Sequence, residues 1–460
     1  MSILSKHIVY FIGIGGIGMS ALAKYFLRQG KIIVGYDRTQ STITIELENA
    51  GAYLHYSETV ESIPVILNTS NNDDILVIYT PAVSSDSPLF SYIRERGLQM
   101  YKRAEVLGMI CNQYPTIAVA GTHGKTTVSS IIAHVLHFSA QNCMAFLGGV
   151  VKNYQSNFIY CTHPQYVVVE ADEYDRSFLQ LTPHAAVITS IDADHLDIYK
   201  TYDALKLAYT DFVAKIYNGG KLLLKKEIAY IPNTDGKHVA FYSTNNKNAE
   251  CIVENIRLER GYFIFDVKTR WGYIMDLKPG ITGDYNVENV LAAVSMCLWL
   301  GIDKELIKNA IAEFKGVKRR FDVQVNNHKH IYIDDYAHHP VEITSFIQSV
   351  RTVFPNQKIT GIFQPHLYSR TRDLASEFAK ALSLLDELWL MNIYPARELP
   401  IAGVNSKIIF DKVTCSKKLM IEDDKILQTV QNQKPALLLT MGAGNIDQWV
   451  ESIKQCLNEE

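Results

Sequence analysis

TIAVAGTHGKTT, at residues 116–127, is the stretch that decides the fold. Its first part, Thr116–Ala120, is apolar or β-branched throughout, which predicts a strand buried on both faces of a parallel sheet. The glycine-rich loop that follows leads into an apolar helical stretch that continues through Leu136. In such a loop backbone N–H groups surround a phosphate, Lys125 neutralises it and the Thr126 hydroxyl can bind Mg²⁺. Val119 stands where the usual motif has its first glycine, so this is a shortened variant.

The same order of strand, glycines and helix occurs twice more. His7–Ile12 precedes the loop Gly13–Gly18 and the helical stretch Met19–Leu27, and Ala436–Thr440 precedes the glycines of Met441–Asn445. Further apolar runs of strand length are Ile32–Gly35, Ile75–Tyr79, Tyr166–Val169, Ala186–Ile191, Ile359–Phe363 and Glu387–Met391. Strands that alternate with helical stretches predict an α/β chain with mostly parallel sheets.

Three such junctions in 460 residues predict three domains. We expect boundaries near Lys102 and after Gly316, which gives the ranges 1–102, 103–316 and 317–460. The stretch 245–280 alternates polar and apolar residues and predicts antiparallel strands inserted in the middle domain.

Composition excludes several classes of function. With 45 basic and 48 acidic residues the net charge is −3, so no overall field attracts nucleic acid or an anionic membrane. No apolar run reaches the length of a spanning helix, and the apolar N-terminal stretch runs into glycines without a signal-peptide cleavage site. The seven cysteines are dispersed, which fits reduced thiols. We therefore expect a cytoplasmic protein without a nucleic-acid or membrane partner.

The first glycine loop predicts a nucleotide site. Gly13, Gly15 and Gly18 match G-x-G-x-x-G, and Asp37 follows the next apolar run. This spacing suits a pyrophosphate on the helix N-terminus and a carboxylate directed at a ribose hydroxyl. NAD and a UDP-sugar satisfy the pattern equally, and glycines needed only for helix–strand packing would also produce it.

Acidic residues follow two of the predicted strands. Glu170, Asp172 and Glu173 come after Tyr166–Val169, and the segment 192–195, DADH, comes after Ala186–Ile191. Because ligands collect at the carboxyl ends of parallel strands, we expect these side chains near the phosphate loop. Thr126 and Glu170 could begin an oxygen ligand set for Mg²⁺, while His195 either binds a second ion or only donates a hydrogen bond. The other acids are equally typical of solvated or helix-capping residues.

Together these segments resemble the Mur ligases, the amide-forming enzymes of peptidoglycan precursor synthesis. The loop GTHGKTT at 121–127 resembles their ATP loop. The segments that support the resemblance are GIGGIGMSALA (13–23), EADEYDRSF (170–178), DADHLDIY (192–199), GDYNVENVLAA (283–293), FKGVKRRFD (314–322), DDYAHHPVEI (334–343), FQPHLYSRTR (363–372) and YPARELPIAG (394–403). The resemblance implies an N-terminal Rossmann-like domain that binds a UDP-sugar, a central P-loop ATPase and a C-terminal Rossmann-like domain.

It also implies a reaction. ATP would phosphorylate the lactyl carboxylate of UDP-N-acetylmuramate, and the amine of L-alanine would attack the acyl phosphate, in a monomer or weak homodimer. One alternative is the ligase that attaches a recycled tripeptide to the same sugar nucleotide. Another is an NAD-dependent oxidoreductase, which leaves Lys125, Glu170 and His195 without a role.

Site residues follow from the resemblance by position. Lys125, Glu170 and His195 would be catalytic, and Thr126, Glu170 and His195 would hold Mg²⁺. The implied ATP-binding set is Gly121, Thr122, His123, Gly124, Lys125, Thr126, Thr127, Asn289, Arg320 and Asp335. The implied substrate-binding set is Gly15, Gly16, Ile17, Asp37, Ser177, Tyr336, His366 and Arg370. Two residues depart from the pattern: Tyr285 stands where relatives often have His, and Leu367 where they often have Arg.

Overall fold

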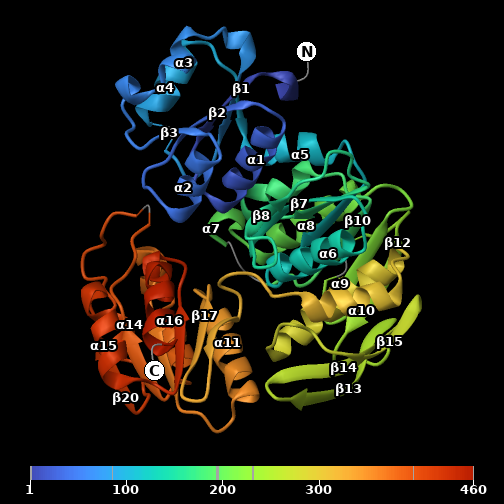
Figure 1. Cartoon of the computed structure of the whole chain (residues 1–460), viewed down its shortest axis with the longest axis vertical. Helices are drawn as coiled ribbons and strands as arrows, with labels where there is room; N and C mark the ends of the chain where they lie inside the picture. Colours follow the sequence, from blue (N-terminus) through green and yellow to red (C-terminus); the bar gives the residue numbers. More distant parts are fainter. Residues whose placement is uncertain (1–2, 85, 193–195, 231–232, 397, 459–460) are drawn as a thin grey trace. The chain divides into compact units, whose positions relative to one another are not determined.

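The computed structural model in Figure 1 is an α/β protein with three largely parallel sheets, which confirms the predicted fold class. It describes residues 3–84, 86–192, 196–230, 233–396 and 398–458. The chain forms two compact units. Unit 1 comprises 1–254, 266–275 and 289–311, and unit 2 comprises 255–265, 276–288 and 312–460.

The first sheet has the strand order β3-β2-β1-β4-β5, with parallel pairing throughout. Alternate residues of β1 face different cores, because Val9 and Phe11 pack with α1 and α5 while Tyr10 packs with α3 and α4. This two-sided burial explains the continuous apolar strand. The elements are β1 (Ile8–Ile12), α1 (Ile17–Arg28), β2 (Ile32–Tyr36), α2 (Thr42–Asn49), β3 (Tyr53–His55), α3 (Val65–Thr69), β4 (Ile75–Tyr79), α4 (Pro88–Glu95), β5 (Met100–Lys102) and α5 (Arg103–Cys111).

The central sheet has the order β15-β14-β13-β12-β11-β10-β6-β9-β7-β8, so the strand before the phosphate loop lies between β10 and β9. Its elements are β6 (Thr116–Ala120), α6 (Lys125–Phe138), β7 (Cys143–Val151), β8 (Ser156–Ile159), β9 (Tyr166–Glu170), the 3₁₀ segment η4 (Tyr174–Gln180), β10 (Ala185–Ile188), α7 (Leu196–Tyr199), α8 (Tyr202–Lys215), β11 (Lys221–Lys225), β12 (His238–Ser243), β13 (Cys251–Glu259), β14 (Tyr262–Thr269), β15 (Gly272–Leu277), α9 (Asp284–Trp299) and α10 (Lys304–Glu313).

The inserted stretch forms β13, β14 and β15, as predicted. Arg260 and Gly261, the two residues between β13 and β14, have φ of 50° and 82°. Two consecutive positive φ angles are typical of the tight turn that reverses a chain into an antiparallel hairpin.

Within unit 1, one apolar core extends from the first sheet through α1 and α5 to the central sheet. Figure 1 shows α1 beside β7 and β8, and the ring of Tyr25 lies 5.9 Å from Phe146 and 6.2 Å from Phe158. The Asn157 amide donates to the Ile17 carbonyl over 2.6 Å. The helix that follows the first glycine loop is therefore fixed against the central sheet.

The third sheet has the order β16-β17-β21-β18-β19-β20, in which only β16 runs against its neighbour among the described strands. α15 and α16 cover one face. The elements are β16 (Asp322–Asn326), β17 (Ile331–Asp335), α11 (Pro340–Val353), β18 (Ile359–Phe363), α12 (Tyr368–Asp373), α13 (Ala375–Leu382), β19 (Glu387–Leu390), α14 (Lys407–Phe410), β20 (Lys417–Met420), α15 (Ile426–Gln433), β21 (Leu437–Met441), the 3₁₀ segment η6 (Asn445–Trp449) and α16 (Val450–Asn458).

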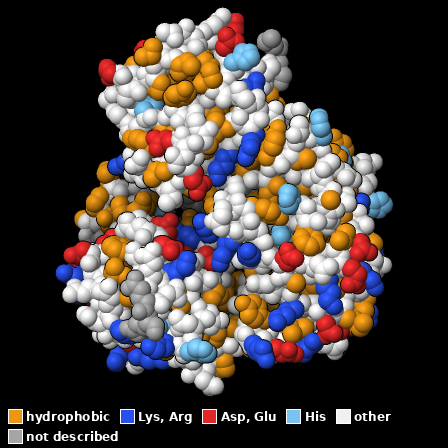
Figure 2. Space-filling view, in the orientation of Figure 1, with side chains coloured by type: hydrophobic (Ala, Val, Ile, Leu, Met, Phe, Trp, Pro, Cys, Tyr) orange, Lys and Arg blue, Asp and Glu red, His pale blue; other side chains and the backbone are white. Residues whose placement is uncertain are grey.

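The surface agrees with the near-neutral composition. In the face shown in Figure 2, Lys and Arg side chains lie among Asp and Glu side chains. None of the described helices combines the length and the apolar character needed to cross a membrane.

Candidate active site

The phosphate loop follows β6 and uses its glycines for two left-handed positions. Gly121 has φ of 133° and Gly124 has φ of 80°, a region that side chains rarely adopt. A Cβ at Gly121 would lie 2.0 Å from Thr189 Oγ1, and one at Gly124 would lie 2.5 Å from Asn289 Oδ1. Gly124 is also the residue from which α6 starts, so the loop ends at a helix N-terminus. The structure thus places Asn289, predicted to bind ATP, against this loop.

The strand beside β6 ends earlier than predicted. β10 stops at Ile188, and Thr189–Asp192 turns to hold the phosphate loop. Thr122 donates its N–H to the Ser190 carbonyl at 3.2 Å, and the His123 N–H bonds to the Ser190 hydroxyl at 3.0 Å. His123 Nε2 also lies 3.7 Å from Asp192 Oδ2. Thr189 still donates its N–H to the Ala120 carbonyl at the end of β6, but Ser190 bonds to the phosphate loop, which explains why the strand ends here.

Lys125 forms a buried ion pair with Glu173. Its Nζ lies 2.8 Å from Oε2 and 3.1 Å from Oε1 of that carboxylate, and the side chains are 12% and 1% exposed. Burial alone would lower the pKa of Lys125, but nearby carboxylates, Glu173 foremost, outweigh it and raise the pKa above its ordinary value. Lys125 is therefore a permanent cation. Glu173 is a structural partner and not the solvated acid that the sequence allowed.

Glu170 ends β9 with an oxygen suited to a cation. Its Oε2 is buried, and no described group donates a hydrogen bond to it. A Cβ on Gly148 of β7 would lie 2.3 Å from this atom, so the missing side chain leaves it room. An unsatisfied carboxylate oxygen suits a hard cation such as Mg²⁺. Thr126 is buried at the start of α6, and His195 lies outside the described residues.

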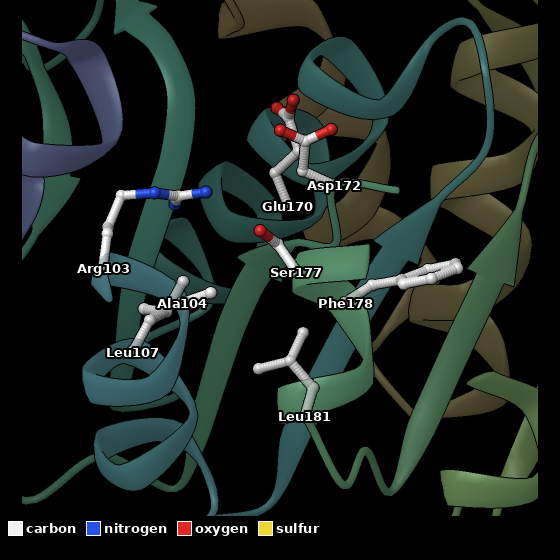
Figure 3. A pocket seen from close by; sticks show the side chains of 8 residues that line it. All are labelled: Arg103, Ala104, Leu107, Glu170, Asp172, Ser177, Phe178 and Leu181. Atoms are coloured by element: carbon white, nitrogen blue, oxygen red, sulfur yellow. The ribbon is translucent and has the colours of Figure 1, made fainter. Parts of the chain in front are cut away.

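Figure 3 shows a small pocket beside Glu170. It is lined by Arg103, Ala104, Leu107, Glu170, Asp172, Ser177, Phe178 and Leu181. The Arg103 guanidinium extends toward the Ser177 hydroxyl and the two carboxylates from the opposite wall. Ser177, predicted to bind substrate, lies here, but sequence reasoning missed Arg103 because no motif contains it.

The first glycine loop is held by its own carboxylate. The Gly15 N–H donates to Asp37 Oδ2 over 2.7 Å, and a Cβ at Gly15 would lie 2.8 Å from the same oxygen. The structure thus brings Asp37, Gly15, Gly16 and Ile17 together at the start of α1. The expected bond from Asp37 to a ribose hydroxyl stays a prediction.

In unit 2, Asp335 at the end of β17 organises the segment 319–321. Its carboxylate accepts from the Phe321 N–H at 2.7 Å and the Ala337 N–H at 2.8 Å. Burial raises its pKa to about 6, against the opposing charge of Arg320. Arg320 lies over the Tyr336 ring at 5.3 Å, and the buried Tyr285 hydroxyl bonds to Asp335. The predicted residues Arg320, Asp335 and Tyr336 are therefore neighbours.

Arg319 has a different environment from Arg320. Its Nε lies 3.4 Å from the buried Asp334 Oδ2, and its guanidinium donates to the Gly442 carbonyl. Burial raises the pKa of Asp334 to about 7, which Arg319 opposes. Arg319 thus connects β17 with Gly442, in the glycine-rich segment after β21. Arg320 instead lies beside Asp335 and Tyr336.

His366 and Arg370 follow β18. The His366 ring stacks on Tyr394 at 5.8 Å and lies 6.2 Å from the ring of His338. Arg370 Nη1 is buried, and no described group accepts a hydrogen bond from it. Leu367, between them, has φ of 72°, a strained value for a side chain. A buried guanidinium N–H without an acceptor suits a carboxylate ligand.

Comparison with known proteins places these sites in a family. A UDP-N-acetylmuramate–L-alanine ligase of Flavobacterium psychrophilum is 45% identical to this chain over 460 residues, all of both chains. One of Parabacteroides distasonis is 46% identical over 99% of this chain and 98% of that one. The solved structure of UDP-N-acetylmuramate-alanine ligase from Thermotoga maritima has a TM-score of 0.80 at 26% identity and covers 98% of both chains.

Domain-level sequence models agree along the chain. The "Mur ligase family, catalytic domain" matches residues 8–115, the "Mur ligase middle domain" matches 119–297, and the "Mur ligase, glutamate ligase domain" matches 319–444. With full-length relatives above 40% identity, this chain belongs to the Mur ligase family.

Proposed function

We propose that this chain is an ATP-dependent ligase that joins L-alanine to the lactyl carboxylate of UDP-N-acetylmuramate, with an acyl phosphate as intermediate and ADP and phosphate as products. The observation that carries the proposal is the permanent cation Lys125 at the end of a glycine loop, beside an unsatisfied carboxylate. The full-length relatives named as alanine ligases support the choice of substrates.

In this proposal the phosphate loop residues 121–127 bind ATP. Lys125 contacts the transferred phosphate, and the N–H groups at the start of α6 surround it. Asn289, which lies against Gly124, would contact the adenine. Arg320 and Asp335, which are neighbours in unit 2, would also bind ATP.

Thr126 and Glu170 would hold Mg²⁺, with His195 as a further candidate. The orphaned Glu170 Oε2 fits such a ligand. When bound, the ion would supply positive charge to the ATP phosphates during transfer.

The substrate residues would come from the first and third sheets and, for Ser177, from the segment after β9 of the central sheet. The first glycine loop, with Gly15, Gly16, Ile17 and Asp37, would bind the UDP-sugar, and Ser177 would contact its muramyl end. Tyr336, His366 and Arg370 would receive L-alanine, because Arg370 offers a buried N–H to the amino-acid carboxylate. We further propose domain ranges of 1–102, 103–316 and 317–460, a monomer or weak homodimer, and a place in the cytoplasm.

The test is phosphate release from ATP with UDP-N-acetylmuramate and either L-alanine or the tripeptide L-alanyl-γ-D-glutamyl-meso-diaminopimelate. We expect turnover with L-alanine and a product whose mass equals the two substrates minus water. Turnover with the tripeptide and none with L-alanine would replace the proposal by the recycling ligase. Reduction of NAD⁺ without phosphate release would contradict both the L-alanine ligase and the tripeptide ligase.

A further inference from the structure

Arg103 lies where two parts of unit 1 meet. It follows β5 as the first residue of α5, and its guanidinium projects into the pocket with Glu170, Asp172 and Ser177 (Figure 3). Its other side touches the first turn of α1. A Cβ built on Gly18 would lie 2.8 Å from Arg103 Nη1 and 3.0 Å from its Cδ. The guanidinium is thus next to both the first glycine loop and the carboxylates of the central sheet.

The third glycine of G-x-G-x-x-G therefore has a specific purpose here. Gly18 needs no positive φ, since its backbone is helical. What it provides is space, because any side chain at this position would displace Arg103.

The loop keeps few N–H groups for a ligand. Gly13 and Ile14 both donate to the Tyr36 carbonyl, Gly15 donates to Asp37, and Gly16 donates to the Gly13 carbonyl. In the described chain the N–H groups of Ile17, Gly18 and Met19 have no acceptor. Any anion bound by the loop must therefore lie on the first turn of α1, the turn that Arg103 touches.

Charge balance favours a cation at this place. The loop Gly13–Gly18 contains no basic side chain, and the Asp37 carboxylate bonded to Gly15 adds a negative charge. A diphosphate brings further negative charge, which uncharged N–H groups alone neutralise poorly. Arg103 is half-buried, and among the described residues it forms neither an ion pair nor a hydrogen bond. Its charge and its donors are available to a ligand.

We propose that Arg103 is a substrate-binding residue that grips the diphosphate of the UDP-sugar, together with the free N–H groups of the first turn of α1. This inference rests on the proposed function. It adds that the cation for the first loop comes from α5, and that the same side chain connects the diphosphate to the pocket beside Glu170.

The experiment measures the binding of UDP and of uridine to the full chain by calorimetry, because the two probes differ only in the diphosphate. Arg103→Gln should weaken UDP about 10- to 100-fold, the range of a lost charge-assisted hydrogen bond, and leave uridine unchanged within twofold. Arg103→Lys should recover part of the loss. ATP affinity should not change, since Lys125 and its loop remain intact.

Arg28→Gln is the matched control, since Arg28 is exposed at the C-terminal end of α1, far along the helix from the first turn. Gly18→Ala gives an independent approach, because it displaces Arg103 without removing its charge and should also weaken UDP. If Arg103→Gln weakened UDP and uridine binding equally, or left UDP binding unchanged, this inference would be overturned while the proposed function would stand. A wild-type chain that binds ATP but not UDP would overturn the proposed function and this inference with it.

Discussion

The buried pair of Lys125 and Glu173 allows a quantitative test of how the phosphate loop is held. At the observed 2.8 Å separation and an effective dielectric constant of about 20, the attraction is about 6 kcal/mol. Burial of both charges offsets part of this, so removing one partner should cost about 3–5 kcal/mol. For Glu173→Gln we expect the lower end, because Asp172 and Glu170 still attract Lys125.

The measurement is a double-mutant cycle with Lys125→Met, Glu173→Gln and the double variant. Urea unfolding of each is followed by circular dichroism, with attention to the transition in which unit 1 unfolds. In the double variant no buried charge is left without its partner. Its loss in free energy of unfolding should therefore be about 2–3 kcal/mol smaller than the sum of the two single losses. Strictly additive losses would refute the argument, because they would mean that the two side chains do not interact in solution.

Three further predictions test neighbouring features. Gly148→Ala should abolish Mg²⁺-dependent phosphate release without unfolding the chain, since its Cβ would lie 2.3 Å from Glu170 Oε2; activity like that of the wild type would argue against a cation at this oxygen. Gly124→Ala should weaken ATP by at least tenfold in a binding assay, through about 1–2 kcal/mol of left-handed strain and a clash with Asn289. Burial lowers the pKa of His134 from 6.5 to about 4, so its stabilising effect is complete above pH 6.5 and falls as the pH drops toward 4. That loss should be about 3 kcal/mol in urea titrations at these two pH values, and His134→Gln should remove the pH dependence.

The strands were predictable from the sequence where burial on both faces leaves a continuous apolar run. β4, β6 and β18 have the predicted bounds because each lies inside a parallel sheet and ends at a polar residue or a glycine. β10 is the exception. Thr189 and Ile191 have residue types that favour a strand, yet Ser190 between them accepts hydrogen bonds from Thr122 and His123 of the phosphate loop, which is distant in sequence.

The side-chain pairings were not predictable, for a related reason. Glu173 lies three residues beyond β9, just before a sharp turn in which Asp175 and Arg176 have φ of 52° and 55°. A positive φ is uncommon for residues other than glycine, and no local pattern indicates two in succession here. The motif located Glu170, but no pattern in the sequence indicates which of the following acids bonds to Lys125.

The two glycine loops of unit 1 show which residues of a phosphate site a sequence motif identifies and which it does not. In each, the early N–H groups hold the loop itself: Thr122 and His123 donate to Ser190, as Gly13 and Ile14 donate to Tyr36. Each therefore leaves the first turn of its helix for phosphate. A helix N-terminus supplies only partial charge, so a cation strengthens the binding of phosphate at each site. The second loop carries its own as Lys125, inside the motif, where sequence reading finds it. The first loop obtains its cation as Arg103, from α5, and only the space left by Gly18 indicates the connection.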